Sequence, residues 1–359
     1  MTRPTSVAIV GAGLAGLSCA RALQQAGLAV TLFEKSRGAS GRMSTRRGDG
    51  WQADHGAQYF TARSPEFLAE VERWMDAGVA ARWAPRLAVL GGNVQHEGQR
   101  DGQHEGQRGG QAQTSTHALH RHVGVPRMTS PAQWLAEGLS VHAQHTVNAL
   151  RRDASGWALG TAEHGWLEAL FGAVLLAVPS PQAEALLRQG TSGAEAVAAA
   201  PLAEVAASVT MRGSWALMLR FDAPLALPFD AAFVNQGPLR WIARDSHKPG
   251  RQAAGGPEVW VLQASAEWSE AHIEDTPEAA TEALLAAFAE LGGAAPQACS
   301  AHRWRDADSL PPAPGLRTWV PELGLGLCGD WLSAGKVEGA WLSGRALAAQ
   351  VLERPSGPL

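Results

Sequence analysis

The sequence predicts an α/β protein in which a parallel sheet, covered by helices on both faces, is combined with a mixed sheet. Residues 6–10 (SVAIV) form a short β-branched run, and an apolar 3.6-residue period then runs from Leu14 to a helix stop at Gly27. Residues 29–35 (AVTLFEK) predict a second strand, which completes a β-α-β unit. The continuous apolar strand 173–178 is typical of a parallel sheet that is buried on both faces.

The remaining elements extend this pattern along the chain. Three helices begin with a capping Ser or Thr followed by proline, and they cover 64–78, 130–139 and 276–293. Further predicted elements are helices that begin near Pro181 and Val337 and strands at 141–147, 156–159, 205–221 and 258–265. The last two strands alternate apolar and polar residues, as antiparallel strands do. The sheet type is therefore expected to change along the chain.

Length, composition and net charge limit the number of domains and the kinds of partner that the chain can have. The chain has 359 residues, of which 45% are hydrophobic and 18% charged. Single cores stop growing beyond about 250–300 residues, so we expect two domains. A net charge of −4 gives no electrostatic reason to expect nucleic acid or an anionic membrane as a partner. Three scattered cysteines indicate a reducing compartment, and no apolar run reaches the ~18 residues of a membrane helix, so we expect a cytoplasmic protein.

A glycine-rich turn joins the first strand to the first helix and reads GAGLAG over residues 11–16. In this G-x-G-x-x-G pattern, Gly11 permits a tight turn and Gly13 lets backbone approach a pyrophosphate. Gly16 lets the helix pack closely on the strand. The pattern alone is a weak signal, but here it follows a strand and opens a helix.

Two further features complete a dinucleotide site. The helix N-terminus at Leu14 and Ala15 supplies N–H donors and the positive end of the helix dipole. Glu34 ends the second strand eighteen residues after Gly16, where a ribose-binding carboxylate is expected. These features predict a bound dinucleotide, which could be NAD or FAD because both contain adenosine diphosphate.

Three features favour FAD. Arg42 lies close enough to Glu34 to reach the same pyrophosphate, although a basic turn in solvent has the same pattern. Gly56 and Ala57 in DHGAQYF are small enough for backbone to approach a flat ring, although a packed strand also uses such residues. The third feature is CGDWLSAGKVEGAWLSG (328–344), which places Asp330 and a glycine-rich helix start directly after a strand.

These motifs resemble the flavin amine oxidase superfamily, as does the strand–helix segment AVPSPQAEALL (177–187). The segments EKSRGASGRMSTRR, DHGAQYFTARSPEF, PLRWIARDSHKPGR, VLQASAEWS and HRWRDA are more specifically similar to the bacterial renalase-like branch. The resemblance covers nearly the whole chain. It implies a Rossmann-like FAD-binding domain split into 1–75, 126–180 and 316–359, interleaved with an α+β substrate domain at 76–125 and 181–315.

The resemblance also implies roles for individual residues in holding a non-covalent FAD. Arg42 and Met43 would flank the pyrophosphate and flavin, and Val147 would meet the adenine through its backbone. Asp330 would contact the ribityl or phosphate side, and a helix would start under the flavin. The full set of expected cofactor-binding residues is Gly11, Gly13, Leu14, Ala15, Gly16, Glu34, Lys35, Arg42, Met43, Gly56, Ala57, Gln58, Tyr59, Val147, Gly329, Asp330, Val337, Glu338, Gly339 and Ala340.

In such an enzyme the flavin carries the chemistry, so the sequence assigns no catalytic residue. The branch implies an oxidase that converts dihydronicotinamide isomers of NAD(P)H to NAD(P)+ while O2 becomes H2O2. One alternative is an oxidase or desaturase of an amine or a hydrophobic small molecule. Another is a flavin-binding protein without catalytic activity that recognises a partner. The sequence leaves the oligomeric state open.

The expected substrate pocket consists of Tyr59, Trp241, Gln263 and Trp304. Typical amine oxidases resemble one another in a lysine beside the flavin and a cage of tyrosines. Here Lys248 is the only lysine of the central segment and Tyr59 the only tyrosine, which disfavours an ordinary monoamine or polyamine oxidase. The sequence also departs from the family at Gln263, where a histidine is frequent, and this leaves the substrate open.

A tandem repeat at 95–110 reads QHEGQRDG and then QHEGQRGG, and we expect a flexible loop there. The nearby His117, His120 and His122 have no cysteine or carboxylate at a ligand spacing. We therefore expect no metal site.

Overall fold

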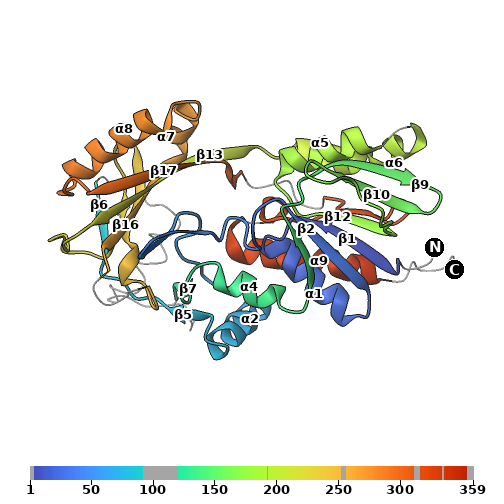
Figure 1. Cartoon of the computed structure of the whole chain (residues 1–359), viewed down its shortest axis with the longest axis horizontal. Coiled ribbons are helices and arrows are strands. Elements are labelled where there is room, and N and C mark those ends of the chain that lie inside the picture. Colours follow the sequence, from blue (N-terminus) through green and yellow to red (C-terminus); the bar gives the residue numbers. More distant parts are fainter. Residues whose placement is uncertain are drawn as a thin grey trace, which may run out of the picture. The chain divides into compact units, whose positions relative to one another are not determined.

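The computed structural model describes residues 4–91, 120–191, 193–251, 256–310, 316–333 and 335–353. The repeat at 95–110 and His117 lie outside the described residues. The chain divides into two compact units, each assembled from separate stretches of sequence (Figure 1). Unit 1 comprises Met1–Met43, Ala132–Met211 and Asp308–Leu359, and unit 2 comprises Ser44–Pro131 and Arg212–Ala307.

Unit 1 is built on a six-stranded sheet with the order β18-β19-β12-β1-β2-β8. Every neighbouring pair is parallel except β18 and β19 at one edge, which are antiparallel. In chain order the strands are β1 (Ser6–Val10), β2 (Ala29–Glu34), β8 (Ser140–Ala143), β12 (Ala173–Leu176), β18 (Trp319–Val320) and β19 (Leu325–Leu327). The predicted α/β class with a Rossmann-like parallel sheet is confirmed.

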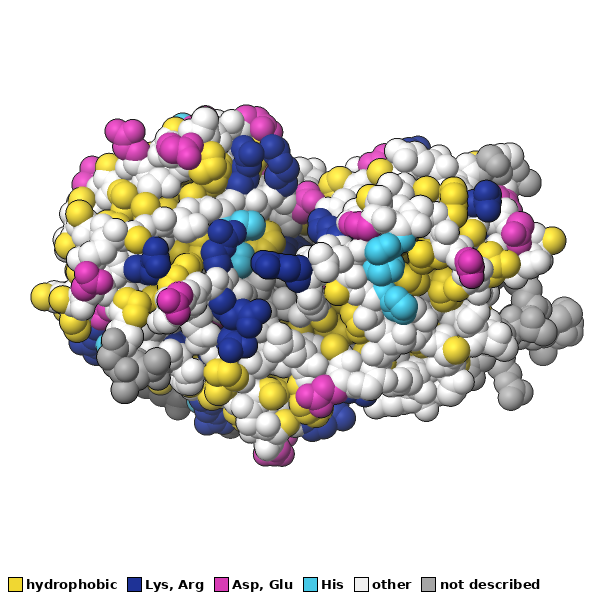
Figure 2. All heavy atoms as spheres, viewed as in Figure 1, with side chains coloured by type: hydrophobic (Ala, Val, Ile, Leu, Met, Phe, Trp, Pro, Cys, Tyr) yellow, Lys and Arg dark blue, Asp and Glu magenta, His cyan; other side chains and the backbone are white. Residues whose placement is uncertain are grey.

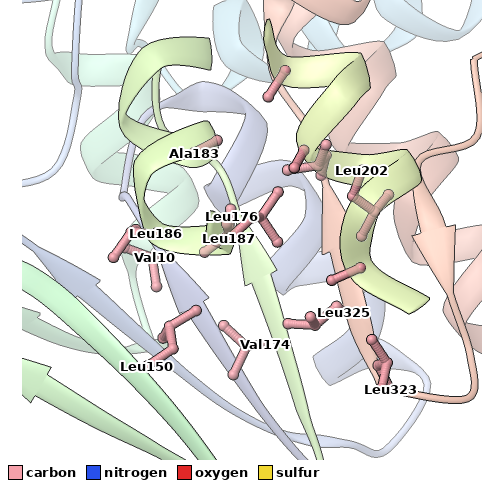
Figure 3. Close-up of a cluster of buried hydrophobic side chains, with 14 of the residues drawn as sticks. Val10, Leu150, Val174, Leu176, Ala183, Leu186, Leu187, Leu202, Leu323 and Leu325 are labelled. Carbon is pink, nitrogen blue, oxygen red and sulfur yellow. The ribbon is translucent and has the colours of Figure 1, made fainter. Parts of the chain in front are cut away.

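One face of this sheet carries a large hydrophobic core. Val10, Val174 and Leu176 point toward helices α5 (Ser180–Gly190) and α6 (Gly193–Ala207) and pack against Leu186 and Leu202 (Figure 3). A three-stranded antiparallel sheet adds its apolar residues to the same core. Its strands are β9 (Val147–Asp153), β10 (Gly156–Thr161) and β11 (Gly165–Trp166).

Helices α1 (Leu14–Gln25) and α9 (Lys336–Leu352) lie side by side in unit 1 (Figure 1). Their backbones approach so closely that a Cβ atom at Gly344 would overlap the carbonyl oxygen of Ala15 and the hydroxyl of Ser18. The Ser18 hydroxyl also donates a hydrogen bond to the carbonyl of Trp341 at 2.9 Å. The contact therefore depends on a glycine in α9 and joins segments more than 300 residues apart in sequence.

Unit 2 is built on a second six-stranded sheet with the order β17-β13-β16-β15-β14-β6. The strands are β6 (Leu87–Leu90), β13 (Met211–Phe221), β14 (Ala231–Val234), β15 (Leu239–Arg244), β16 (Glu258–Ala264) and β17 (Ala298–Ser309). Leu217, Leu262 and Ile242 share one face and pack with helix α8 (Pro277–Glu290) in a second core. The next pair of facing residues along β15 and β16, Trp241 and Gln263, points to the opposite face of the sheet.

Shorter elements complete the chain. They are the β3 (Thr45–Gly48) and β4 (Trp51–Asp54) hairpin, the β5 (Ala80–Arg82) and β7 (His122–Gly124) pair, helices α2 (Pro65–Asp76), α4 (Ser130–Ala136) and α7 (Ala266–Ala271), and 3₁₀ turns η1 (Asp245–His247) and η2 (Asp330–Leu332). Helix α2 begins as predicted, with the Ser64 side chain accepting from the Phe67 N–H. No helix in the described ranges is long and apolar enough to cross a membrane.

The structure corrects two of the predicted elements. The expected strand 141–147 is two strands, β8 and β9, separated by Gln144, which adopts a left-handed backbone with φ of 56°. The expected strand 205–221 begins only at Met211, because helix α6 continues to Ala207 and buries Leu202 and Ala203 in the unit 1 core.

The two units also differ from the expected domain limits. Residues 44–75 group with unit 2, since Ala53 of β4 packs against Met218 and Val261 of the unit 2 sheet. Residues 181–211 group with unit 1 because α5 and α6 cover its sheet.

The α1–α9 contact gives a stability prediction. Replacing Gly344 with leucine should lower the free energy of unfolding by about 1–3 kcal/mol, because the new side chain must push α9 away from α1. Gly38→Ala is the control, since a Cβ atom there meets no other atom within 4 Å, and it should change stability by less than about 0.5 kcal/mol. Denaturant titration measures both, and equal stability of the two variants would contradict the close packing.

Candidate functional site

The carboxyl ends of the parallel strands in unit 1 bring the predicted binding residues to one edge of the sheet. Gly11 follows β1, Glu34 is the last residue of β2, and Asp330 lies three residues beyond β19. Ligands of open parallel sheets bind at this edge, beyond the carboxyl ends of the strands. The arrangement is therefore that of a nucleotide site.

The three glycines of the turn are needed for different reasons. A Cβ atom at Gly11 would lie 2.6 Å from the carbonyl oxygen of Ala177, and one at Gly16 would overlap the carbonyl oxygen of Gly11. At Gly13 the nearest atom is the Cα of Gly41, 3.9 Å away. Folding thus requires glycine at two positions, whereas the space at Gly13 is available to a ligand.

Polar groups at the same edge suit a dinucleotide. Helix α1 has Gly13 as its N-cap and no side-chain cap, so a ligand can accept from its first N–H groups. The Glu34 carboxylate accepts from the N–H groups of Ala12 and Ser36, both at 2.8 Å. Each of its two oxygens keeps a second lone pair that can accept from a ribose hydroxyl.

The carboxyl-terminal half of the site is joined to the turn region by an ion pair. Arg42 binds the Asp330 carboxylate, which is almost fully buried, and Ser40 forms a β-bridge with Gly13. The N–H of Gly329 donates to the Ser343 hydroxyl in α9 at 3.0 Å. Helix α9 starts at Lys336, one residue before the predicted start, after Gly335 with a positive φ of 69°.

Other predicted residues of unit 1 differ in their surroundings. Met43 is buried, and Val147 starts β9 in the same core as Phe33, the neighbour of Glu34. Val337 and Gly339 are buried in the first turns of α9, whereas Glu338 and Ala340 are half-buried. Lys35 is exposed, and nothing in the structure explains its expected role.

The predicted residues of unit 2 gather on one face of its sheet around the segment 55–59. Gln263 donates to the Gly56 carbonyl at 2.7 Å, and Trp304 donates to the His55 carbonyl at 3.0 Å. The Tyr59 ring lies 5.3 Å from the Trp241 ring, centroid to centroid. The four expected pocket residues therefore lie in one region of unit 2, around the segment 55–59. Trp83 and Phe233 belong to the same region, because their rings contact Trp241.

A buried group of four charges fixes this segment. Asp54 accepts from Arg251 at 2.6 Å, Asp245 lies 2.7 Å from the Lys248 ammonium, and none of these side chains is exposed. Burial would raise the pKa of Asp54, but Lys248 and Arg251 outweigh it and hold that pKa below its usual value. Lys248 also donates to Gln58 at 3.3 Å. Lys248 is thus a structural partner of buried carboxylates.

Sequence reasoning did not single out His55, His302 and Arg46, which meet on the same face of unit 2. The His55 ring lies 4.7 Å from the His302 ring and 5.3 Å from the Trp304 ring. Alternation along β17 places Ser300, His302 and Trp304 on one face of the strand. This alternation is the signal in the sequence that could have placed His302 beside the expected pocket residue Trp304. Across the described parts of the chain, no group of three or more His, Cys, Asp or Glu residues could hold a metal ion.

Comparison with known families agrees with this geometry. Residues 9–74 match the NAD(P)-binding Rossmann-like domain, and residues 91–352 match the flavin containing amine oxidoreductase model. The chain belongs to the flavin containing amine oxidoreductase family. The family is named for its flavin, and the expected cofactor class is confirmed.

Several characterised proteins are similar to this family member. The tRNA 5-methylaminomethyl-2-thiouridine biosynthesis bifunctional protein of Magnetococcus marinus is 28% identical over 206 residues, which are 48% of this chain and 29% of that protein. The L-amino-acid oxidase of Bothrops pauloensis is 49% identical over 57 residues, 15% of this chain and 11% of the oxidase. The chain thus spans less than a third of the length of these curated relatives.

Solved structures show a similar fold over nearly the whole chain. Putrescine oxidase bound to putrescine has a TM-score of 0.67 at 16% identity, with 99% of this chain and 100% of that chain covered. Cyclohexylamine oxidase from Brevibacterium oxydans has a TM-score of 0.68 at 14% identity, covering 97% of this chain and 98% of that one. At these identities the likeness concerns the fold.

The open space at Gly13 predicts a variant that separates folding from cofactor binding. Gly13→Ala should change the melting temperature of the cofactor-free protein by no more than about 2 °C, because the new methyl group meets only the Cα of Gly41, at an ordinary contact distance of 3.9 Å. It should weaken FAD binding by about tenfold or more, since the methyl group occupies the space of the pyrophosphate. Calorimetric titration with FAD measures this, and unchanged affinity would contradict the assignment.

The histidines of unit 2 predict a pH dependence of stability. Burial, then neighbouring His302 and Arg46, lower the pKa of His55 to about 3, and burial and Arg46 lower that of His302 to about 4. Unfolded histidines titrate near 6.5, so between pH 7 and 5 the unfolded chain binds more protons and stability falls as the pH falls.

Thermal melts of the FAD-loaded protein between pH 7 and 5 measure this slope. His302→Gln should make the slope shallower, because it removes one group that differs between the two states. His142→Gln is the control at an exposed position in unit 1 and should leave the slope unchanged. An unchanged slope in both variants would contradict the buried, neutral state of His302.

Proposed function

We propose that unit 1 holds a non-covalent FAD through the residues at the carboxyl edge of its sheet. The α1 N-terminus and the space at Gly13 accommodate the pyrophosphate, and Glu34 accepts from the adenosine ribose. Arg42 and Asp330 form an ion pair beside that edge. The N-terminus of α9 contributes N–H donors to the flavin end of the cofactor. Cys328, the cysteine nearest to Asp330, is fully buried, which supports a cofactor that is not covalently attached.

We further propose that the hydride donor is a dihydronicotinamide isomer of NAD(P)H. The donor and a proton would give NAD(P)+ and H2O2 when O2 is the final electron acceptor. Bound FAD supplies the hydride acceptor and returns the two electrons to O2. The residues of unit 2 bind and orient the donor and exclude water from it.

The state of Lys248 carries this proposal. An amine oxidase of the usual kind needs a lysine beside the flavin, but the Lys248 ammonium is completely buried between Asp245 and Asp54. The other two lysines, Lys35 and Lys336, belong to unit 1. Unit 2 also has Tyr59 as its only tyrosine, whereas a cationic amine is usually held by several aromatic rings or a free carboxylate.

Oxidation of an amine or a hydrophobic small molecule is the second candidate. The family itself and the contacts among Tyr59, Trp83, Phe233 and Trp241 favour it, because these rings form an apolar wall on unit 2. Such a wall can bind an apolar donor as well as a nicotinamide ring. Only the reaction distinguishes the two candidates.

An anaerobic reduction assay decides between them. Mixing the FAD-loaded protein with 2-dihydro-NAD or 6-dihydro-NAD should bleach the flavin absorbance within seconds, and admitting O2 should restore it with one H2O2 per donor. Putrescine, cyclohexylamine and L-amino acids serve as comparison donors. Bleaching by these amines alone would establish the second candidate, and bleaching by no donor would favour a flavin-binding protein without this activity.

A further inference from the structure

A polar cluster on the sheet face of unit 2 carries the positive charge of Arg46. Arg46 of β3 donates to the Ser300 hydroxyl at 3.4 Å and to Nδ1 of His302 at 3.2 Å. Both partners are uncharged, and Arg46 forms no ion pair among the described residues. On the face drawn in Figure 2, one of the groups of histidine side chains (cyan) has Lys and Arg side chains (dark blue) next to it.

Two donors of this cluster have capacity for a ligand. Arg46 has five N–H groups and uses two of them on Ser300 and His302. Because Nδ1 of His302 accepts from Arg46, the proton of the neutral ring is on Nε2, which then donates elsewhere. Within the described residues, this Nε2–H has no hydrogen-bond partner. The cluster therefore offers a guanidinium and an imidazole N–H side by side.

The surroundings keep this arrangement ready for an anion. His302 packs edge-on to Trp304, with ring centroids 4.5 Å apart, and this packing fixes the orientation of the imidazole. With a pKa lowered to about 4, His302 stays neutral at pH 7, so the charge of the cluster comes from Arg46. The buried carboxylates of Asp54 and Asp245 are already paired with Lys248 and Arg251.

We propose that Arg46 and the Nε2–H of His302 form a binding site for an oxyanion of the hydride donor, either a phosphate or a carboxylate. The site adjoins the expected substrate residues, since Trp304 donates to the His55 carbonyl and the His55 ring packs on His302. It selects anionic donors over cationic ones. This inference rests on the proposed oxidase function and specifies the chemical class of its substrate.

Binding of simple anions tests the site without any hydride transfer. Isothermal titration calorimetry of the FAD-loaded protein with pyrophosphate, and separately with benzoate, distinguishes the phosphate from the carboxylate. Arg46→Gln should weaken the preferred anion by about tenfold or more, because a hydrogen bond to a charged group is lost. Arg46→Lys should restore part of the affinity, because it keeps the charge.

Arg47→Gln is the matched control, because it removes the same charge from the next residue of β3, which is exposed. It should change the affinity by less than about twofold, as expected for a screened surface charge. The proposed site would be wrong if Arg46→Gln and Arg47→Gln weakened anion binding equally, or if neither variant weakened it.

The oxidase function is tested separately by the same variants. With a dihydronicotinamide dinucleotide that is turned over, Arg46→Gln should raise KM and leave kcat within about twofold, as loss of uniform binding does. If anion binding depends on Arg46 but no such donor reduces the flavin, the anion site stands and the proposed donor is wrong. If the donor reduces both proteins with equal KM, the donor stands and the anion site is wrong.

Discussion

The backbone contact between helices α1 and α9 is the constraint on which the cofactor site depends. Gly344 lies against the Ala15 carbonyl and the Ser18 hydroxyl, so α9 can approach the helix that follows the GAGLAG turn. Any side chain at Gly344 would separate the two helices. The Ser343 hydroxyl of α9 also accepts a hydrogen bond from the Gly329 N–H. The packing of α9 on α1 therefore positions Asp330, the residue after Gly329, beside Arg42. Residues from both ends of the chain can then serve one dinucleotide.

Unit 2 depends on a different interaction, the buried network of Asp54, Asp245, Lys248 and Arg251. Buried charges are tolerated only when they are paired and hydrogen-bonded, and this network pairs two anions with two cations. It fixes the start of the segment 55–59, on which His55, Gly56 and Tyr59 are arranged. It also pairs Lys248 with two carboxylates, so this ammonium is not available to a ligand in unit 2.

Much of unit 1 could be predicted because its signals are local. The β-α-β unit, the glycine turn and Glu34 lie within 34 residues, and turn chemistry and helical periodicity determine their conformation. The break between β8 and β9 was missed because a left-handed Gln144 leaves no mark in an apolar pattern. The contact of Arg46 with His302 joins positions 256 residues apart, so only the assembled sheet reveals it. The contact at Gly344 could not be predicted for the same reason, since a glycine in a helix does not show which other helix packs against it.

Amide hydrogen exchange with and without FAD tests most directly whether the two distant motifs hold one cofactor. Adding FAD to the cofactor-free protein should slow exchange at residues 11–17 and at 335–340 together, with the same dependence on FAD concentration. Helix α8 in the unit 2 core should be unaffected. Protection of the GAGLAG segment without the start of α9, or at a clearly different FAD concentration, would contradict a single site built from both ends of the chain.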